Sequence, residues 1–141
     1  MSLTGLRAAV GVLALAATGI SAYLVTVHYS GGPIVCFAGG GCETVQNSEY
    51  AHIGGLPLSV LGLAVYVGIG LTAAFRGELA ALAGFALGLS AGIFAVYLIV
   101  VQAAVLDAIC AWCLASDAIA LMLLVLGVLR LRAEPVAPAP A

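Results

Sequence analysis

Two cysteines lie three residues apart near the end of the chain, in the stretch LDAICAWCLASD that covers residues 106–117. Cys110 and Cys113 have the spacing of a dithiol that can form and break a disulfide, and Asp117 follows Cys113 by about one helical turn. If a helix begins at this pair, its unpaired N–H groups and its dipole stabilise a thiolate on the first cysteine. Because a thiolate is the nucleophile of disulfide exchange, the stretch predicts redox chemistry.

A second pair, Cys36 and Cys42, lies in a segment rich in glycine, with Gly39–Gly41 between the two thiols. Glycine relaxes the limits on backbone conformation, so these thiols can join in one disulfide or move apart. In an oxidising compartment, an even number of cysteines suggests either static disulfides or a relay between the pairs. The C-x5-C spacing does not match the compact ligand sets of zinc, and we predict no metal site.

The chain is too apolar for a soluble domain. Of its 141 residues, 65% are hydrophobic and 7% are charged, whereas soluble domains carry roughly 25% charged residues. Four apolar runs, each of about the 20 residues that cross a bilayer core as a helix, cover residues 6–27, 56–75, 79–106 and 109–131. The sequence therefore predicts an all-α membrane protein. We expect a single membrane domain over residues 1–141, built as a four-transmembrane-helix bundle with a long extracytoplasmic loop between the first two helices.

The basic residues indicate an orientation. The chain has no lysine, and its four arginines lie before the first run, between the second and third runs, and after the fourth run: Arg7, Arg76, Arg130 and Arg132. With four crossings these places are on one side of the membrane, which the positive-inside rule makes cytoplasmic. All four cysteines then lie on the extracytoplasmic side. We therefore predict a multi-pass protein of the bacterial inner membrane with both termini in the cytoplasm. The first run also resembles a signal peptide, but it stays apolar through Val27, which favours a membrane helix.

The ordered motifs resemble those of the vitamin K epoxide reductase family, in particular its short bacterial members. The motifs are C-x5-C in CFAGGGCETVQNSEY, Ser48 six residues after Cys42, GGLPLSVLG at the start of the second apolar run, and C-x-x-C at the start of the fourth. The resemblance covers about residues 5–132, and residues 133–141 form a tail rich in proline and alanine. Some relatives carry a fused thioredoxin-like domain. We expect no such domain here, and we therefore expect the thiol partner to be a separate protein.

The resemblance implies a membrane thiol oxidoreductase that drives disulfide bond formation. Electrons would pass from a secreted thioredoxin-like thiol oxidase to a membrane quinone, either menaquinone or ubiquinone. By position in the family, Cys36 is the residue that the partner's thiol attacks. Cys42 exchanges with Cys110, and Cys113 donates to the quinone. The residues expected around the quinone are Val45, Ser48, Tyr50 and Asp117.

Two positions depart from the vertebrate members of the family. Those proteins carry an Asn at the start of the second helix and a Tyr one turn after the C-x-x-C, whereas this chain has Leu58 and Asp117. The difference favours plain quinone reduction over epoxide reduction. A carboxylate within the membrane is usually functional or partnered. Asp117 is therefore expected either to pass a proton to the quinone or to pair with Ser90 or Tyr97.

Two other functions are compatible with four apolar helices. A small multidrug-type transporter has this architecture, but it needs an acidic residue in its first helix, and residues 6–27 contain none. A structural membrane subunit with static disulfides is the second alternative, and exchangeable thiols would distinguish the relay from it. Trp112 is predicted to lie in the aromatic belt of the membrane or beside the quinone. Close helix packing is predicted for the small-residue stripe Gly84, Gly88 and Gly92.

Overall fold

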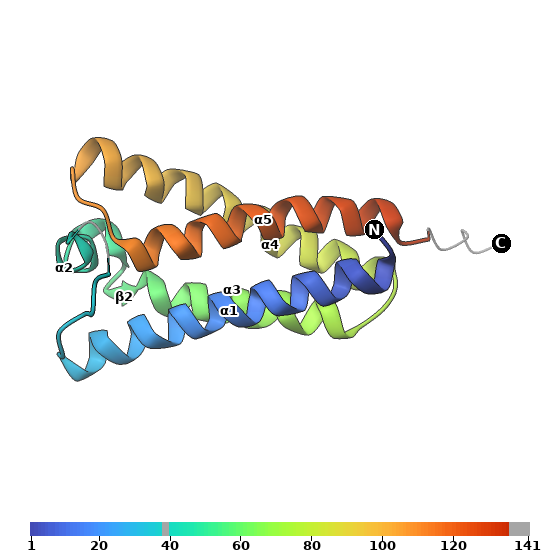
Figure 1. Ribbon diagram of the computed structural model, residues 1–141, viewed down its shortest axis with the longest axis horizontal. Coiled ribbons are helices and arrows are strands. Elements are labelled where there is room, and N and C mark those ends of the chain that lie inside the picture. The colour runs from blue at the N-terminus through green and yellow to red at the C-terminus, as the bar shows by residue number, and fades with distance from the viewer. Residues whose placement is uncertain (38–39, 136–141) are drawn as a thin grey trace.

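The computed structural model describes residues 1–37 and 40–135, and most of this part of the chain is helical. Four long helices run side by side along the long axis of the molecule (Figure 1): α1 (Leu3–Ser30), α3 (Leu58–Ala74), α4 (Glu78–Val100) and α5 (Ala111–Ala133). A π-helical segment, η2 (Val101–Val105), continues α4. Between α1 and α3 lie four short elements: α2 (Cys42–Gln46), the 3-10 turn η1 (Glu49–Ala51), β1 (His52–Ile53) and β2 (Leu56–Pro57).

Three helical segments are long and apolar enough to cross a membrane: Leu3–Ser30, Glu78–Val105 and Ala111–Ala133. Helix α3 is also apolar but shorter, with 17 residues. Among the described residues, the sheet consists of the antiparallel pair β1 and β2. The prediction of a predominantly helical protein with apolar helices of membrane-spanning length is confirmed.

Small residues allow the helices to approach closely. Helix α1 packs against α3 and α5, and α4 packs against α3 and α5. A Cβ atom on Gly88 of α4 would lie 3.4 Å from the backbone oxygen of Leu123 in α5, and one on Gly92 would lie 2.8 Å from the side chain of Leu124. The packing role predicted for these glycines is confirmed, because larger side chains would separate α4 from α5.

Two arginines cap the end of α3. The Arg7 guanidinium in α1 donates hydrogen bonds of 2.9 Å to the carbonyl oxygens of Ala73 and Ala74. Arg130 in α5 donates a bond of 2.8 Å to the carbonyl oxygen of Phe75. The last carbonyls of a helix have no intrahelical donors, and cations at this end also complement the helix dipole. The arginines therefore fix where α3 ends and join it to both neighbouring helices.

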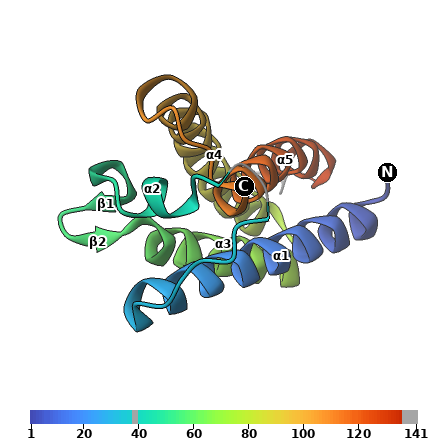
Figure 2. The same cartoon turned by 60° about the vertical axis from the view of Figure 1, so that its left-hand side comes forward.

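The cysteines and the arginine caps lie at opposite ends of the bundle. The start of α1, the end of α5 and the connection between α3 and α4 share one end, whereas α2 and the β-hairpin share the other (Figure 1). Figure 2 shows α2 beside the two strands at that second end. The short elements between α1 and α3 therefore lie where α5 begins, and this arrangement brings the loop cysteines to the C-x-x-C pair.

Candidate redox site

The C-x-x-C pair lies at the N-terminus of α5, as predicted. Cys110 is the N-cap residue, and its sulfur accepts a hydrogen bond of 3.3 Å from the backbone N–H of Cys113. Both residues are free thiols, with Cys110 buried and Cys113 half-buried. A hydrogen bond from the Cys113 side chain, helped by backbone N–H groups, outweighs burial and lowers the pKa of the Cys110 thiol from 9.0 to about 7. Cys110 is thereby prepared to act as a thiolate.

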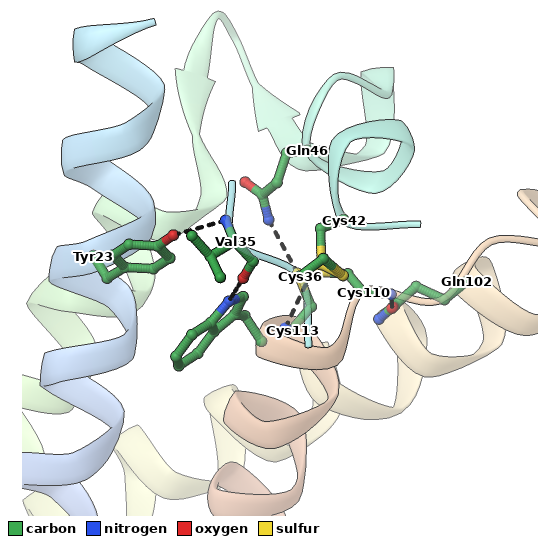
Figure 3. Close-up of a disulfide and its surroundings, with 9 residues drawn as sticks. Tyr23, Val35, Cys36, Cys42, Gln46, Gln102, Cys110 and Cys113 are labelled. Atoms are coloured by element: carbon green, nitrogen blue, oxygen red, sulfur yellow. Dashed lines mark hydrogen bonds between the residues drawn. A yellow bond between two sulfur atoms is a disulfide. The ribbon is translucent and has the colours of Figure 1, made fainter. Parts of the chain in front are cut away.

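The loop cysteines, Cys36 and Cys42, form a disulfide that lies next to the C-x-x-C pair (Figure 3). Cys42 and Cys110 are both fully buried and belong to one apolar cluster, against which Cys36 and Cys113 also pack. The fold therefore brings together all four cysteines singled out in the sequence. Of the pairings that the sequence left open, the structure holds Cys36–Cys42 with the helix pair reduced.

A glycine makes the close approach of the two pairs possible. The Gly41 N–H donates to the carbonyl oxygen of Ile109 at 3.1 Å, so the residue before Cys42 contacts the residue before Cys110. A Cβ atom on Gly41 would lie 2.6 Å from Ile109 N and 2.7 Å from Ile109 O. The position therefore requires glycine because two backbone segments meet there. Gly39, also expected to make this segment adaptable, lies outside the described residues.

A cavity of about 310 Å³ opens beside Cys113, between the helices and the loop. Most of its walls are apolar, with a few convergent polar groups, as is typical of small-molecule sites. Among the described residues that line it, Cys113 is the only cysteine. The lining includes all four residues predicted to surround a quinone: Val45, Ser48, Tyr50 and Asp117.

The polar groups predicted for this cavity have partners within the chain. The Ser48 hydroxyl donates to the carbonyl oxygen of Val45 at 2.7 Å. Asp117 is 5% exposed, and its Oδ2 accepts a hydrogen bond of 3.4 Å from Gln102 Nε2. The amide partner of Asp117 is therefore Gln102, and not Ser90 or Tyr97, the partners considered from the sequence.

Sequence reasoning missed several polar residues at the site. Gln102 also accepts a hydrogen bond of 2.9 Å from the backbone N–H of Cys110, so one amide joins the redox pair to Asp117. Gln46 donates a bond of 3.0 Å to the sulfur of Cys113 (Figure 3). The Ser59 hydroxyl lies in the cavity wall and is buried without a partner among the described residues. Gln102 and Ser59 could have been found from the sequence, because each is a polar residue inside an apolar run.

Trp112 lies outside the cavity. Its indole N–H donates to the carbonyl oxygen of Val35 at 2.6 Å. The indole centroid is 5.0 Å from the ring centroid of Tyr23 and 5.2 Å from that of Phe37. Among the described residues, the cavity lining does not include Trp112, so of its two predicted places the structure gives no support to the one beside the quinone. Its hydrogen bond and its contact with Phe37 are with the segment that carries Cys36, and its contact with Tyr23 is with α1.

Comparison with known protein families matches residues 8–128 to the vitamin K epoxide reductase family. The matched region contains both cysteine pairs and all the described residues that line the cavity. No individual curated protein matches the chain.

Proposed function

The chain belongs to the vitamin K epoxide reductase family, and from this premise we propose that it is a quinone-linked thiol oxidoreductase that drives disulfide bond formation. Electrons enter from a secreted thioredoxin-like thiol oxidase and leave to a membrane quinone, menaquinone or ubiquinone. One observation carries the proposal. Cys113 faces a cavity that contains every residue expected around a quinone, while Cys110 is buried against Cys42 of the loop pair.

We also propose that the chain is one membrane domain that crosses the bacterial inner membrane four times. At 17 residues, α3 is at the short limit of the lengths that span a bilayer. With four crossings, the arginines at one end of the bundle face the cytoplasm together with both termini. The loop after α1 and all four cysteines then face the extracytoplasmic side, where disulfides persist.

In the proposed electron path, the partner's thiolate attacks Cys36, which is less buried than Cys42, and releases Cys42 as a thiolate. Cys42 attacks Cys110 in the oxidised helix pair and releases Cys113. The partner's second thiol closes the partner's disulfide and frees Cys36, which attacks Cys42 and releases Cys110. The partner dithiol has then been oxidised, and two electrons lie on the helix pair. This is the same pairing of cysteines that the structure has.

The residues of the cavity fit a quinone. Its apolar walls suit a ring, and the buried Ser59 hydroxyl has no acceptor among the described residues, so a ligand oxygen would satisfy it. A bound quinone accepts two electrons and two protons. Gln46 fixes the Cys113 sulfur at the cavity by a hydrogen bond. Asp117, one turn further along α5, is placed to supply a proton, and formation of the Cys110–Cys113 disulfide restores the oxidised helix pair.

We propose plain quinone reduction rather than epoxide reduction. Leu58 lines the cavity where vertebrate relatives have an Asn, and its apolar side chain cannot hydrogen-bond a ligand oxygen. Asp117 takes the place of their Tyr. The two side chains expected to contact the ligand oxygens in those relatives are therefore both changed.

The decisive experiment combines the purified protein with a short-chain quinone and a reduced thioredoxin-like oxidase, and follows quinone absorbance. We expect one quinone to be reduced for each partner disulfide formed. Cys113→Ala should abolish this reaction. Cys36→Ala should abolish the reaction with the protein partner but retain part of the reaction driven by a small dithiol. Full activity of Cys113→Ala would overturn the proposal. A transporter or a static subunit would reduce no quinone with any donor.

A further inference from the structure

The backbone of Val35 is held by two side chains from different helices. Trp112 in α5 donates its indole N–H to the Val35 carbonyl oxygen at 2.6 Å. Tyr23 in α1 accepts the Val35 N–H on its hydroxyl oxygen at 3.0 Å, as Figure 3 shows. An extended segment outside a sheet otherwise leaves these groups to water. Because Val35 directly precedes Cys36, the two bonds anchor the loop disulfide to the bundle.

Two aromatic rings contact the Trp112 indole of this anchor. The Tyr23 ring is tilted by 45° against the indole, and the Phe37 ring is perpendicular to it at 90°. Such tilted and edge-to-face arrangements are favourable for aromatic pairs. Because Val35 is 70% exposed, the two hydrogen bonds rather than burial hold this residue, while the neighbouring Ile34 and Cys36 pack against the apolar cluster of the redox site. We call Tyr23, Val35 and Trp112, which share the two hydrogen bonds, the Val35 clamp.

Cys42 has a separate anchor at the same place. Gly41 is bonded through its N–H to the carbonyl oxygen of Ile109 at 3.1 Å. Cys36 and Cys42 are therefore each tied to the start of α5 by contacts that do not involve their disulfide. When the disulfide opens, both anchors can persist, and neither sulfur needs to leave the redox site.

We propose that the Val35 clamp positions Cys36 for its return to Cys42, and so resets the relay after each transfer. The inference rests on the proposed function, because it assigns the clamp to one step of that path. In this step the Cys36 thiolate attacks Cys42 in the Cys42–Cys110 disulfide. The Cys36–Cys42 bond forms, the Cys42–Cys110 bond breaks, and Cys110 leaves as the thiolate, with no net oxidation. The clamp raises the effective concentration of Cys36 at Cys42.

A variant with three cysteines isolates this step without quinone or partner. In Cys113→Ala, one disulfide and one free thiol can be arranged as three isomers, and the proposed step interconverts two of them. One isomer has Cys36–Cys42 with Cys110 free, and the other has Cys42–Cys110 with Cys36 free. Acid quenching, alkylation and mass spectrometry of the peptides give the ratio of the isomers at equilibrium.

In this background we expect Trp112→Phe, which keeps a ring but lacks the N–H donor, to shift the ratio toward Cys42–Cys110. Tyr23→Phe removes the acceptor oxygen and should shift the ratio in the same direction. Each shift should be about 3- to 10-fold, the factor that corresponds to one lost hydrogen bond. Phe37→Leu is the matched control, because Phe37 touches the indole without a hydrogen bond to Val35, and it should change the ratio by less than about twofold.

The possible outcomes separate the clamp from the relay. Helical circular dichroism identifies the folded variants, and Tyr23→Phe keeps the test decisive if Trp112→Phe does not fold. Ratios unchanged within about twofold in both folded variants overturn the clamp alone. If Cys42–Cys110 forms in no protein, including Cys113→Ala with the clamp intact, the relay itself is wrong and the clamp inference fails with it.

Discussion

Asp117 is an acidic residue placed within an apolar cavity, beside the sulfur that faces it. If it delivers a proton to the quinone, Asp117→Asn should slow quinone reduction by about 10²- to 10⁴-fold, the usual contribution of general acid catalysis. The pH profile of turnover should also lose one limb. Disulfide exchange among the cysteines should be unchanged, because Asp117 is not part of that path.

The measurement is turnover per folded molecule as a function of pH, for the parent protein and Asp117→Asn. A purely structural Asp117 predicts a different result. The bond with Gln102 would be weakened and thermal stability would fall, while the pH profile of the folded protein would keep both limbs.

A second prediction concerns the ionisation of the Cys110 thiol. Because its pKa is lowered from 9.0 to about 7, the thiolate fraction should rise as the pH passes through 7 and level off well below the range of an ordinary thiol. The ultraviolet absorbance of the thiolate in the reduced protein, corrected with a Cys110→Ser variant, measures this directly.

The largest cause of the lowered pKa of Cys110 is its hydrogen bond with the Cys113 side chain. Cys113→Ala should therefore raise the pKa of Cys110 and move the absorbance transition to higher pH. A transition that stays near pH 7 in this variant would assign the effect to the start of α5 alone.

At the scale of elements, the contact between α2 and the start of α5 depends on Gly41. Gly41→Ala would place a Cβ atom 2.6 Å from a backbone nitrogen that cannot move far, so α2 must shift away from α5. We expect the Cys42–Cys110 disulfide of the Cys113→Ala protein to form at least about tenfold more slowly, since exchange needs the two sulfurs in line.

Gly32→Ala is the matched control for this change. Gly32 lies in the same loop, but a Cβ atom there would be 3.4 Å from its nearest neighbour, the flexible hydroxyl of Ser30. It should leave the rate of Cys42–Cys110 formation unchanged, as followed by timed alkylation. Equal rates in both alanine variants would show that α2 does not need its close contact with Ile109.

The long helices could be predicted from hydropathy alone, because a bilayer forces each backbone polar group to be satisfied within its own helix. The C-x-x-C motif at the start of an apolar run likewise placed Cys110 at a helix terminus. The loop between α1 and α3 could not be predicted in the same way. Its conformation depends on contacts with α5, such as those of Trp112 with Val35 and of Gln46 with Cys113. No local sequence pattern predicts these contacts.

For the whole molecule, the separation of cysteines and arginine caps predicts the topology. In spheroplasts treated with a reductant, an impermeant thiol reagent should reach Cys36 from outside, because its side chain is only partly buried. The buried Cys42 and Cys110 should react from the same side only after the loop opens. The same reagent added outside inverted vesicles, where it meets the cytoplasmic face, is the control. Labelling of any cysteine from the cytoplasmic side contradicts the proposed orientation.

The arginine caps on α3 also bear on the lipids around the molecule. Helix α3 has 17 residues and α1 has 28, which correspond to about 25 Å and 42 Å at 1.5 Å per residue. Arg7 and Arg130 hold charged groups at the end of α3, so a bilayer core of about 30 Å must thin around α3 if that helix crosses it. Helix α1 must instead tilt or extend beyond the core. We therefore expect the hydrophobic thickness of the bundle to be smaller around α3 than around α1. The α3 side should favour lipids with shorter acyl chains and the α1 side lipids with longer ones.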